Sequence, residues 1–223
     1  MELFLGTAER REREKLQRRE DIVDSAEKVF FSKGYEQATM DDVATKAELS
    51  KGTLYLYFKS KEELYFAIIL RAFKILHGMF DNAVSNAVTG FQKAKAIGDT
   101  YINFAKEYPE YFNALMYYES LEINFEKVKA EYNFKEDITV AAFHESDKTT
   151  EELASAIQLG MDDGTLRKDL DAHKTAIMLW GATTGMLQLL SLKGHCIKKF
   201  YDNSPEEYLN YFMKFMENCL LPR

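Results

Sequence analysis

The sequence of 223 residues has only three prolines and eleven glycines, and alternating apolar and polar runs of the kind that form strands are scarce. This scarcity predicts an all-α chain. Its two cysteines, Cys196 and Cys219, have neither metal-site nor redox spacing and suit a reducing cytoplasm. No apolar leader follows Met1, and the uncharged run at residues 176–192 is shorter than the roughly 20 residues that cross a bilayer. We therefore expect a cytoplasmic protein that makes no use of a membrane, with this run as a buried helix.

Motifs of enzyme active sites are also missing from the sequence. The four histidines (His77, His144, His173 and His195) lack metal-ligand spacing, and there is no phosphate-binding glycine loop and no nucleophile elbow. His195 and Cys196 are adjacent, but neighbouring side chains on a helix diverge by about 100°, so we do not expect them to share a metal. The sequence predicts a protein that is not an enzyme and needs no cofactor.

The charge of the chain is acidic overall, with a formal net charge of −7, yet it is unevenly distributed. Residues 45–61 contain four lysines (46, 51, 59 and 61) and one glutamate (48), which gives a local charge of +3. Because charges are screened over about 10 Å at ordinary salt, an acidic body does not prevent a local basic face from meeting DNA.

Helix starts are marked by capping residues. Thr39, Ser50, Ser60, Thr149 and Ser204 each precede a segment with helical periodicity, and several are followed three residues later by an acidic residue. Further helices are expected at residues 101–108, 111–121, 122–144 and 150–161, in the segment around Trp180, and after Pro205, with a turn at 162–166.

The N-terminal part has the dimensions of a helix-turn-helix unit. One apolar helix face ends at Lys33 and Gly34, a short helix follows Thr39, and a tight turn at residues 48–50 leads into a third helix. Leu54 and Phe58 are four residues apart in that third helix, so both are expected to point into a small core.

The opposite side of the third helix carries groups that suit nucleic acid. With Leu54 and Phe58 inward, helical geometry turns Lys51, Tyr55 and part of Thr53 outward. Such side chains can bind phosphates and base edges in a major groove. The alternative is that the tyrosines simply pack against the domain core.

The stretch MDDVATKAELSKGTLYLYFKSKEEL after Thr39, with FFSKGYEQAT before it, closely resembles the DNA-binding signature of the tetracycline repressor-like (TetR) transcriptional regulators. The resemblance covers about residues 18–66. It implies a helix-turn-helix DNA-binding domain at residues 1–65 and a larger helical-bundle domain for ligand binding and dimerisation at residues 66–223. Many relatives have histidine where this chain has Tyr57. The positions that the resemblance assigns to DNA are Thr39, Lys51, Gly52, Thr53, Tyr55, Tyr57 and Lys61.

The basic segment RREREKLQRRE at residues 10–20 allows two interpretations. Its arginines could reach a minor groove, as N-terminal arms do in some relatives. Its oppositely charged pairs four residues apart also suit a solvated extension of the first helix, which we favour.

The resemblance further implies a homodimer that binds a palindromic operator in double-stranded DNA, with a four-helix interface from residues 150–163 and 172–194. Small residues four apart in both segments would let helices approach closely. The alternative is that these glycines pack within one subunit. The candidate interface residues are Ala156, Gly160, Trp180, Gly181, Thr184, Gly185 and Gln188.

The later helices are rich in aromatic residues and methionine, which suits a pocket for a small apolar or aromatic effector that releases DNA. Most aromatic residues at helical spacing are simply core, and a helix-turn-helix regulator controlled by a protein partner is the alternative. A packed core would favour that alternative, and a cavity of several hundred Å³ would favour the sensor. The candidate pocket residues are Phe73, His77, Phe80, Tyr101, Phe104, Tyr108, Phe112, Met116, Tyr117, Phe143 and Met178.

Overall fold

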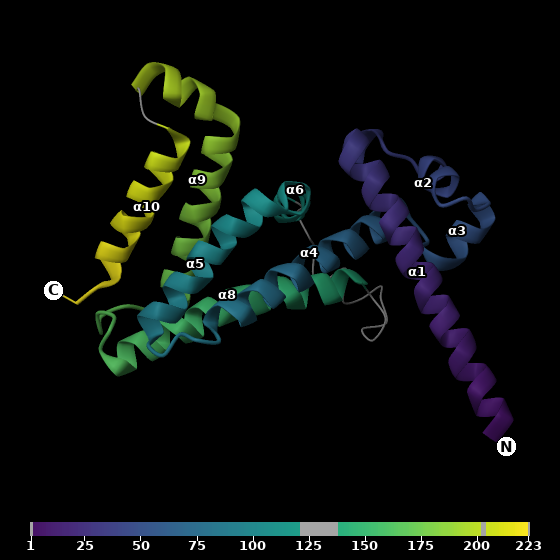
Figure 1. The fold of residues 1–223 in the computed structure, drawn as a ribbon, viewed down its shortest axis with the longest axis horizontal. Coiled ribbons are helices and arrows are strands. Elements are labelled where there is room, and N and C mark those ends of the chain that lie inside the picture. Colours follow the sequence, from purple (N-terminus) through teal and green to yellow (C-terminus); the bar gives the residue numbers. More distant parts are fainter. Residues whose placement is uncertain (1, 121–137, 202–203, 223) are drawn as a thin grey trace. The chain divides into compact units, whose positions relative to one another are not determined.

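The computed structural model describes residues 2–120, 138–201 and 204–222, and every regular element in these ranges is an α-helix (Figure 1). The prediction of an all-α chain is confirmed. By internal contacts the chain divides into two compact units. The N-terminal unit comprises Met1–Ala72 and Asn113–Ala142, and the C-terminal unit comprises Phe73–Phe112 and Phe143–Arg223. The division between Ala72 and Phe73 falls within the helix that follows Ser60, whereas the sequence analysis divides the chain after residue 65. The domains at residues 1–65 and 66–223 stay a prediction.

The N-terminal unit is built from α1 (Glu2–Gln37), α2 (Met40–Lys46), α3 (Lys51–Tyr57) and the first part of α4 (Lys61–Val84). In Figure 1, α2 and α3 lie beside the C-terminal part of α1. Apolar side chains from all four helices form one small core, because each helix turns an apolar face inward. The fully buried members of this core include Ile22, Ala26, Val43, Leu54, Phe58, Leu64 and Ile68.

The capping predictions for this unit are confirmed. Thr39 and Asp42 form a reciprocal capping box at the start of α2, and the Ser50 hydroxyl accepts a hydrogen bond from the Thr53 amide at the start of α3. The Ser60 hydroxyl accepts from the Glu63 amide at 3.0 Å in the same way. These bonds satisfy amide groups that have no partner within the helix, and so fix where α2, α3 and α4 begin.

Arg71 ties α4 to α1 within the N-terminal unit. Its guanidinium lies 2.5 Å from the carboxylate of Glu20, 2.7 Å from that of Asp24 and 2.9 Å from that of Glu27. Because one planar guanidinium can serve several carboxylates, the α1 surface and α4 are held in a fixed register.

A cluster of aromatic rings closes the same unit. Tyr35 lies 4.8 Å from Tyr65 and 4.8 Å from Tyr117, measured between ring centroids, and Phe30 lies 5.1 Å from Tyr65. Burial is the main cause that raises the pKa of both Tyr35 and Tyr65 to about 12. The folded unit therefore favours the neutral phenols.

This burial predicts a loss of stability in strong alkali. The two buried neutral phenols contribute fully to the free energy of unfolding below pH 10, the ordinary tyrosine pKa. This contribution is lost as the pH rises through about 12, the pKa of both tyrosines in the folded protein. We expect the double variant Tyr35→Phe/Tyr65→Phe to unfold at higher pH than the wild type in a circular-dichroism pH titration. Tyr211→Phe, at a site that is 73% exposed, is the control and should leave the transition in place. An unchanged transition in the double variant would contradict the assignment.

The C-terminal unit contains the rest of α4 together with α5 (Gly90–Glu107), most of α8 (Ile138–Asp163), α9 (Ala172–Tyr201) and α10 (Pro205–Leu220). The helix α6 (Pro109–Glu119) begins two residues before the predicted start at residue 111, and its residues are shared between the two units. Figure 1 shows α9 running beside α10 and α5. The predicted cap of α10 is confirmed, since Ser204 and Glu207 form a capping box.

The start of α5 packs directly on the end of α8. A Cβ atom built on Gly90 would lie 1.9 Å from the Gly160 nitrogen and 2.6 Å from the Ala156 carbonyl oxygen, so the two backbones are in contact. The Gly90 amide donates to the Asp163 carboxylate at 2.7 Å. Gly164, with φ of +78°, makes the expected turn after α8, because glycine enters this left-handed region without strain.

The structure differs from the sequence prediction along α8. Most of the predicted helix at 122–144 lies outside the described residues, and its end is continuous with the helix predicted at 150–161. The prediction that Thr149 caps a helix start is wrong. The Thr149 hydroxyl donates to the Glu145 carbonyl at 3.1 Å, one turn earlier in the same helix, which is the alternative use of threonine inside a helix.

The prediction that residues 176–192 form a buried helix is also wrong for the single chain. One face of α9 is exposed, including Ile177 at 54%, Met178 at 73% and Leu192 at 71%. The helix is 30 residues long, and among the described helices it is the one that is long and apolar enough to cross a membrane. The uncharged run at residues 176–192 underestimates the length of this helix, because α9 continues beyond the run at both ends.

Candidate nucleic-acid interface and effector cavity

The third helix, α3, presents a mixed surface to solvent. Leu54 and Phe58 are fully buried, as predicted, whereas Lys51 and Gly52 are exposed and Thr53, Tyr55 and Tyr57 are half-buried. Ser50 fixes the start of the helix, and Phe58, with extended backbone, ends it. Leu54 and Phe58 therefore anchor α3 in the core of the unit, and the other sides of the helix face solvent.

Several polar groups expected at DNA are held by partners within the protein. The Lys51 ammonium lies 2.7 Å from the Asp41 carboxylate, and the Thr53 hydroxyl lies 2.8 Å from that of Ser50. The Asp41 carboxylate raises the pKa of Lys51, chiefly through this hydrogen bond. Thr39 is engaged with Asp42 in the capping box. A DNA phosphate that binds one of these groups would have to displace its partner within the protein.

Two basic side chains, Arg19 and Lys61, bind the main chain near the ends of the helix-turn-helix segment. The Arg19 guanidinium lies 4.0 Å from the centre of the Phe58 ring and donates to the Tyr57 carbonyl at 2.9 Å. The Lys61 ammonium donates to the Tyr35 carbonyl at 2.9 Å and lies 4.3 Å from the centre of that ring. Lys61 therefore serves the end of α1 in this structure, although it was expected at phosphate.

The sequence analysis missed Leu56 on α3. Its side chain is 73% exposed, and it lies opposite the buried side of the helix defined by Leu54 and Phe58. The helical phase that placed the polar residues could have identified it.

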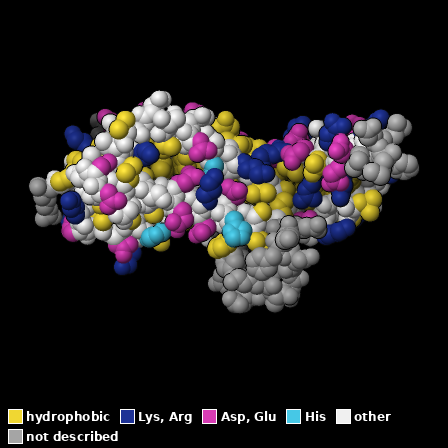
Figure 2. All heavy atoms as spheres, turned by 90° about the horizontal axis from the view of Figure 1, so that it is seen from below, with side chains coloured by type: hydrophobic (Ala, Val, Ile, Leu, Met, Phe, Trp, Pro, Cys, Tyr) yellow, Lys and Arg dark blue, Asp and Glu magenta, His cyan; other side chains and the backbone are white. Residues whose placement is uncertain are grey.

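Charged side chains of both signs are interspersed on the surface seen in Figure 2. The basic segment at residues 10–20 is part of α1, and Arg10 pairs with Glu14 at 2.8 Å within that helix. This ion pair fits the solvated helical extension that the sequence analysis favoured.

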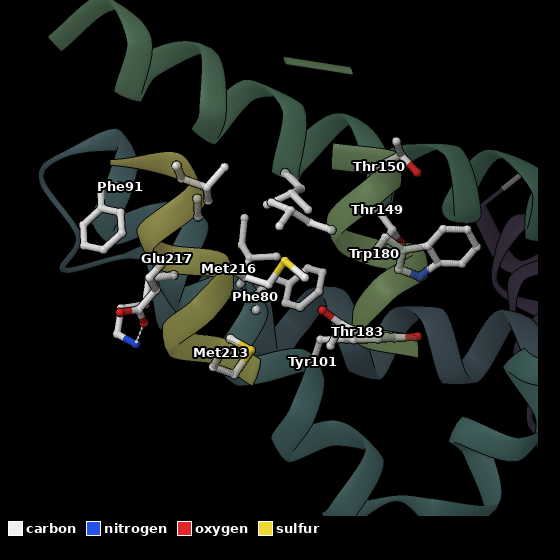
Figure 3. Close-up of a pocket in the computed structure, with 17 residues that line it drawn as sticks. Phe80, Phe91, Tyr101, Thr149, Thr150, Trp180, Thr183, Met213, Met216 and Glu217 are labelled. Atoms are coloured by element: carbon white, nitrogen blue, oxygen red, sulfur yellow. Dashed lines mark hydrogen bonds and ion pairs between the residues drawn. The ribbon is translucent and has the colours of Figure 1, made fainter. Parts of the chain in front are cut away.

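A cavity of about 70 Å³ lies inside the C-terminal unit, between α4, α5, α8, α9 and α10 (Figure 3). Its walls are mainly apolar, and Phe80, Tyr101, Met213 and Met216 point into it. An ion pair between Lys95 and Glu217 stands at one side of the cavity. The threonines Thr149, Thr150 and Thr183 supply hydroxyl groups elsewhere on the wall.

The structure does not bring all the candidate pocket residues together. Phe80 and Tyr101 line the cavity, and the Tyr101 hydroxyl lies 2.9 Å from that of Thr184. Phe112 packs its ring against Tyr101, with the centroids 5.9 Å apart. Phe104 and Tyr108 stack on each other at 5.7 Å. Phe73 is buried beside His77.

Of the eleven candidate pocket residues, Phe80 and Tyr101 line the cavity and the other nine do not. Four of these nine either belong to the other unit or are exposed. Met116 and Tyr117 belong to the N-terminal unit, where Tyr117 packs on Tyr35. Phe143 is 36% exposed and Met178 is 73% exposed. The aromatic and methionine side chains at helical spacing therefore lie in several different parts of the protein and do not form one pocket.

His77 is buried and joins α4 to α8. Its Nε2 atom lies 3.0 Å from the Thr149 hydroxyl and 3.1 Å from the Glu145 carbonyl oxygen. Its Nδ1 atom lies 3.6 Å from the carboxylate of Glu145 and 3.5 Å from that of Glu152. Since Thr149 also lines the cavity, the histidine is one side chain away from it.

The candidate dimer residues divide into buried, exposed and half-buried groups. Ala156 and Gly160 are buried within the unit, where Gly160 contacts Gly90 and Leu166. Gly181 and Gly185 are exposed, and a Cβ atom on either would meet nothing within 4 Å. Gln188 is exposed on the same helix, whereas Trp180 and Thr184 are half-buried, and Trp180 lines the cavity. The open surface is therefore on α9.

These features define an all-α protein with an N-terminal helix-turn-helix unit of the kind that places its third helix in DNA. Residues 22–68 match the family described as bacterial regulatory proteins, tetR family. This match supports the resemblance to that family found in the sequence of the helix-turn-helix region.

Two curated relatives share the N-terminal region. The transcriptional activator FasR of Mycolicibacterium smegmatis is 33% identical over 88 residues, which cover 40% of this chain and 40% of that protein. The negative transcriptional regulator IcaR of Staphylococcus epidermidis is 36% identical over 47 residues, 21% of this chain and 25% of that protein. The chain thus matches less than half the length of these relatives. Both are named as transcriptional regulators, in agreement with the expectation that the chain is not an enzyme.

The whole fold is similar to solved structures. The regulator FadR from Bacillus subtilis, solved in complex with stearoyl-CoA, has a TM-score of 0.68 and 14% identity, and the match covers 88% of this chain and 96% of that chain. At this identity the similarity establishes the fold.

Proposed function

We propose that the chain is a sequence-specific transcriptional regulator in the bacterial cytoplasm, a repressor that binds a palindromic operator as a homodimer. The observation that carries this proposal is α3, a capped helix that stands on Leu54 and Phe58 and leaves its other sides open to a major groove. The polar side chains around it can bind phosphates and bases once their internal partners are exchanged.

A second copy of the chain would cover the open face of α9. Exposed apolar side chains lie there beside Gly181 and Gly185, and small residues allow two helices to approach closely. A palindromic site requires two recognition helices related by a two-fold axis, which a dimer supplies. Sedimentation that shows only monomer at micromolar concentration would contradict this part of the proposal.

The operator can be found by selecting bound sequences from a random DNA pool with the purified protein. We expect enrichment of a palindrome whose half-sites are about one helical turn apart, or a multiple of that distance. Enrichment of no sequence would overturn the proposed function. A transcription assay on a promoter that contains the operator then separates repression from activation.

The Asp41–Lys51 ion pair predicts a gain in DNA affinity on removal of the carboxylate. In Asp41→Asn, Lys51 is free to bind phosphate and one negative charge leaves the DNA-facing side, so we expect operator affinity to rise about threefold to tenfold at low salt. The gain should shrink as salt increases. Asp81→Asn makes the same charge change on an exposed site of the C-terminal unit and should have little effect. Equal affinities of Asp41→Asn and wild type would contradict a role for Lys51 at DNA.

For the C-terminal unit, we propose that a small apolar effector enters the cavity and lowers operator affinity. The apolar walls support this proposal, and a protein of similar fold binds stearoyl-CoA. Met213 and Met216 have flexible side chains that can yield to a ligand. The test is a thermal-shift screen of apolar compounds, followed by operator binding at saturating concentrations of each hit. If no stabilising ligand changes operator affinity, the sensor proposal fails.

One observation favours a second candidate, a regulator controlled by a protein partner without an effector. The cavity of about 70 Å³ is smaller than the roughly 300–1,000 Å³ of most ligand pockets. A ligand would have to widen it. The screen decides between the two candidates, since a partner-controlled protein should yield no hit that acts on DNA binding.

A further inference from the structure

The outermost position of α3 is occupied by a leucine. Leu56 is 73% exposed, whereas Leu54 and Phe58 on the opposite side are fully buried. At 100° per residue, Leu56 lies about half a turn of the helix away from the midpoint between these two core residues. It is therefore the side chain that a surface approaching α3 from outside would meet first.

Gly52 lies one helical turn before Leu56 on the same face. A Cβ atom built on Gly52 would meet only the Ser50 hydroxyl at 3.9 Å, so nothing inside the protein requires glycine there. Glycine within a helix is less stable than alanine at the same position. An outside surface that approaches the backbone closely would account for this glycine, and Leu56 would then be pressed against the same surface.

The chemistry of Leu56 limits what it can recognise. Its side chain has no hydrogen-bond donor or acceptor, so it cannot read the polar groups of a base pair. Among the base edges in the major groove, thymine alone adds a methyl group at C5, and apolar side chains contact that group. Cytosine, the other pyrimidine, has no methyl at this position.

We propose that Leu56 is a specificity-determining residue that selects thymine by packing on its C5-methyl group in each half-site. This inference rests on the proposed DNA-binding function. It assigns base selection at one position to an apolar contact, beside the polar contacts expected from Lys51, Thr53 and Tyr55. Burial of one methyl group against leucine corresponds to about a fourfold change in affinity.

The experiment uses the full-length protein and the operator selected from the random pool. Each thymine in a half-site is replaced singly by deoxyuridine, which removes the methyl group and keeps the hydrogen-bonding edge. For the wild type, we expect one position at which affinity falls roughly fourfold with one half-site changed and roughly fifteenfold with both changed. For Leu56→Ala, the same replacement should have no effect.

The control variant is Val88→Ala, which shortens another exposed apolar side chain, 83% exposed and located in the C-terminal unit. It should keep the wild-type sensitivity to deoxyuridine. Because Leu56 is exposed, Leu56→Ala is expected to fold, and its circular-dichroism spectrum and unfolding temperature verify this. A wild type that tolerates every deoxyuridine, or a Leu56→Ala variant that stays as sensitive as wild type, overturns the assignment while leaving the proposed function standing. If no sequence is enriched from the pool, the proposed function fails and the assignment fails with it.

Discussion

Replacing Gly90 with alanine is expected to destabilise the C-terminal unit by about 3 kcal/mol, at the upper end of ordinary overpacking. The added Cβ atom would lie 1.9 Å from the Gly160 nitrogen and 2.3 Å from its Cα atom, so it meets backbone and not a side chain that could rotate away. The helices α5 and α8 would have to separate. That separation also weakens the 2.7 Å hydrogen bond from the Gly90 amide to the Asp163 carboxylate.

Chemical unfolding of both proteins at equal concentration measures this effect. Gly78→Ala is the matched control, because Gly78 is an exposed residue of α4 and an added Cβ atom would meet nothing within 4 Å. It should gain about 0.5–1 kcal/mol from the higher helix propensity of alanine. If Gly90→Ala proves as stable as Gly78→Ala, the close packing of α5 on α8 is not present in solution.

Replacing Gly52 with alanine is expected to have opposite effects on stability and on function. The folded protein should gain about 0.5–1 kcal/mol, since an added Cβ atom would contact only the Ser50 hydroxyl, at 3.9 Å. Operator affinity should fall about tenfold or more, because in the proposed complex the same atom would occupy the space of a phosphate or base edge beside the backbone. A tenfold loss corresponds to about 1.4 kcal/mol.

Thermal unfolding and operator titration of the same preparation test both halves of this prediction. Gly78→Ala is again the control, and it should become more stable with unchanged operator affinity. A Gly52→Ala protein that binds the operator as tightly as wild type would show that the helix backbone does not approach DNA at this position. Loss of stability in Gly52→Ala would show that the glycine has a role within the fold.

The helix-turn-helix unit could be predicted from the sequence because its signals are local. Each capping residue, Thr39, Ser50 and Ser60, bonds to an amide three residues further on, so the neighbouring sequence contains both partners. The inward positions of Leu54 and Phe58 follow from helical phase alone. The direction of Leu56 follows from the same phase, but the role proposed for it also depends on the exposure seen in the fold.

The C-terminal unit was harder to predict because its contacts join distant segments. Met178 has the same apolar character as Met213, yet Met178 is 73% exposed and Met213 lines the cavity. The local sequence around each methionine does not indicate whether another helix packs over it. The prediction that Thr149 is a helix cap was wrong because a threonine hydroxyl has two local uses. It can accept from an amide later in the chain, as a cap does, or donate to a carbonyl one turn earlier, as Thr149 does to Glu145.

The backbone contact between Gly90 and Gly160 also limits how the bundle can change during evolution. At this joint the distance between α5 and α8 is set by the main chain, so no gradual exchange of side chains can adjust it. The wall that α10 contributes to the cavity is different, because Met213 and Met216 can be replaced by smaller or larger apolar side chains without moving the main chain. Descendants of this protein should therefore vary the size of the cavity through α10, while the pair of glycines stays as it is.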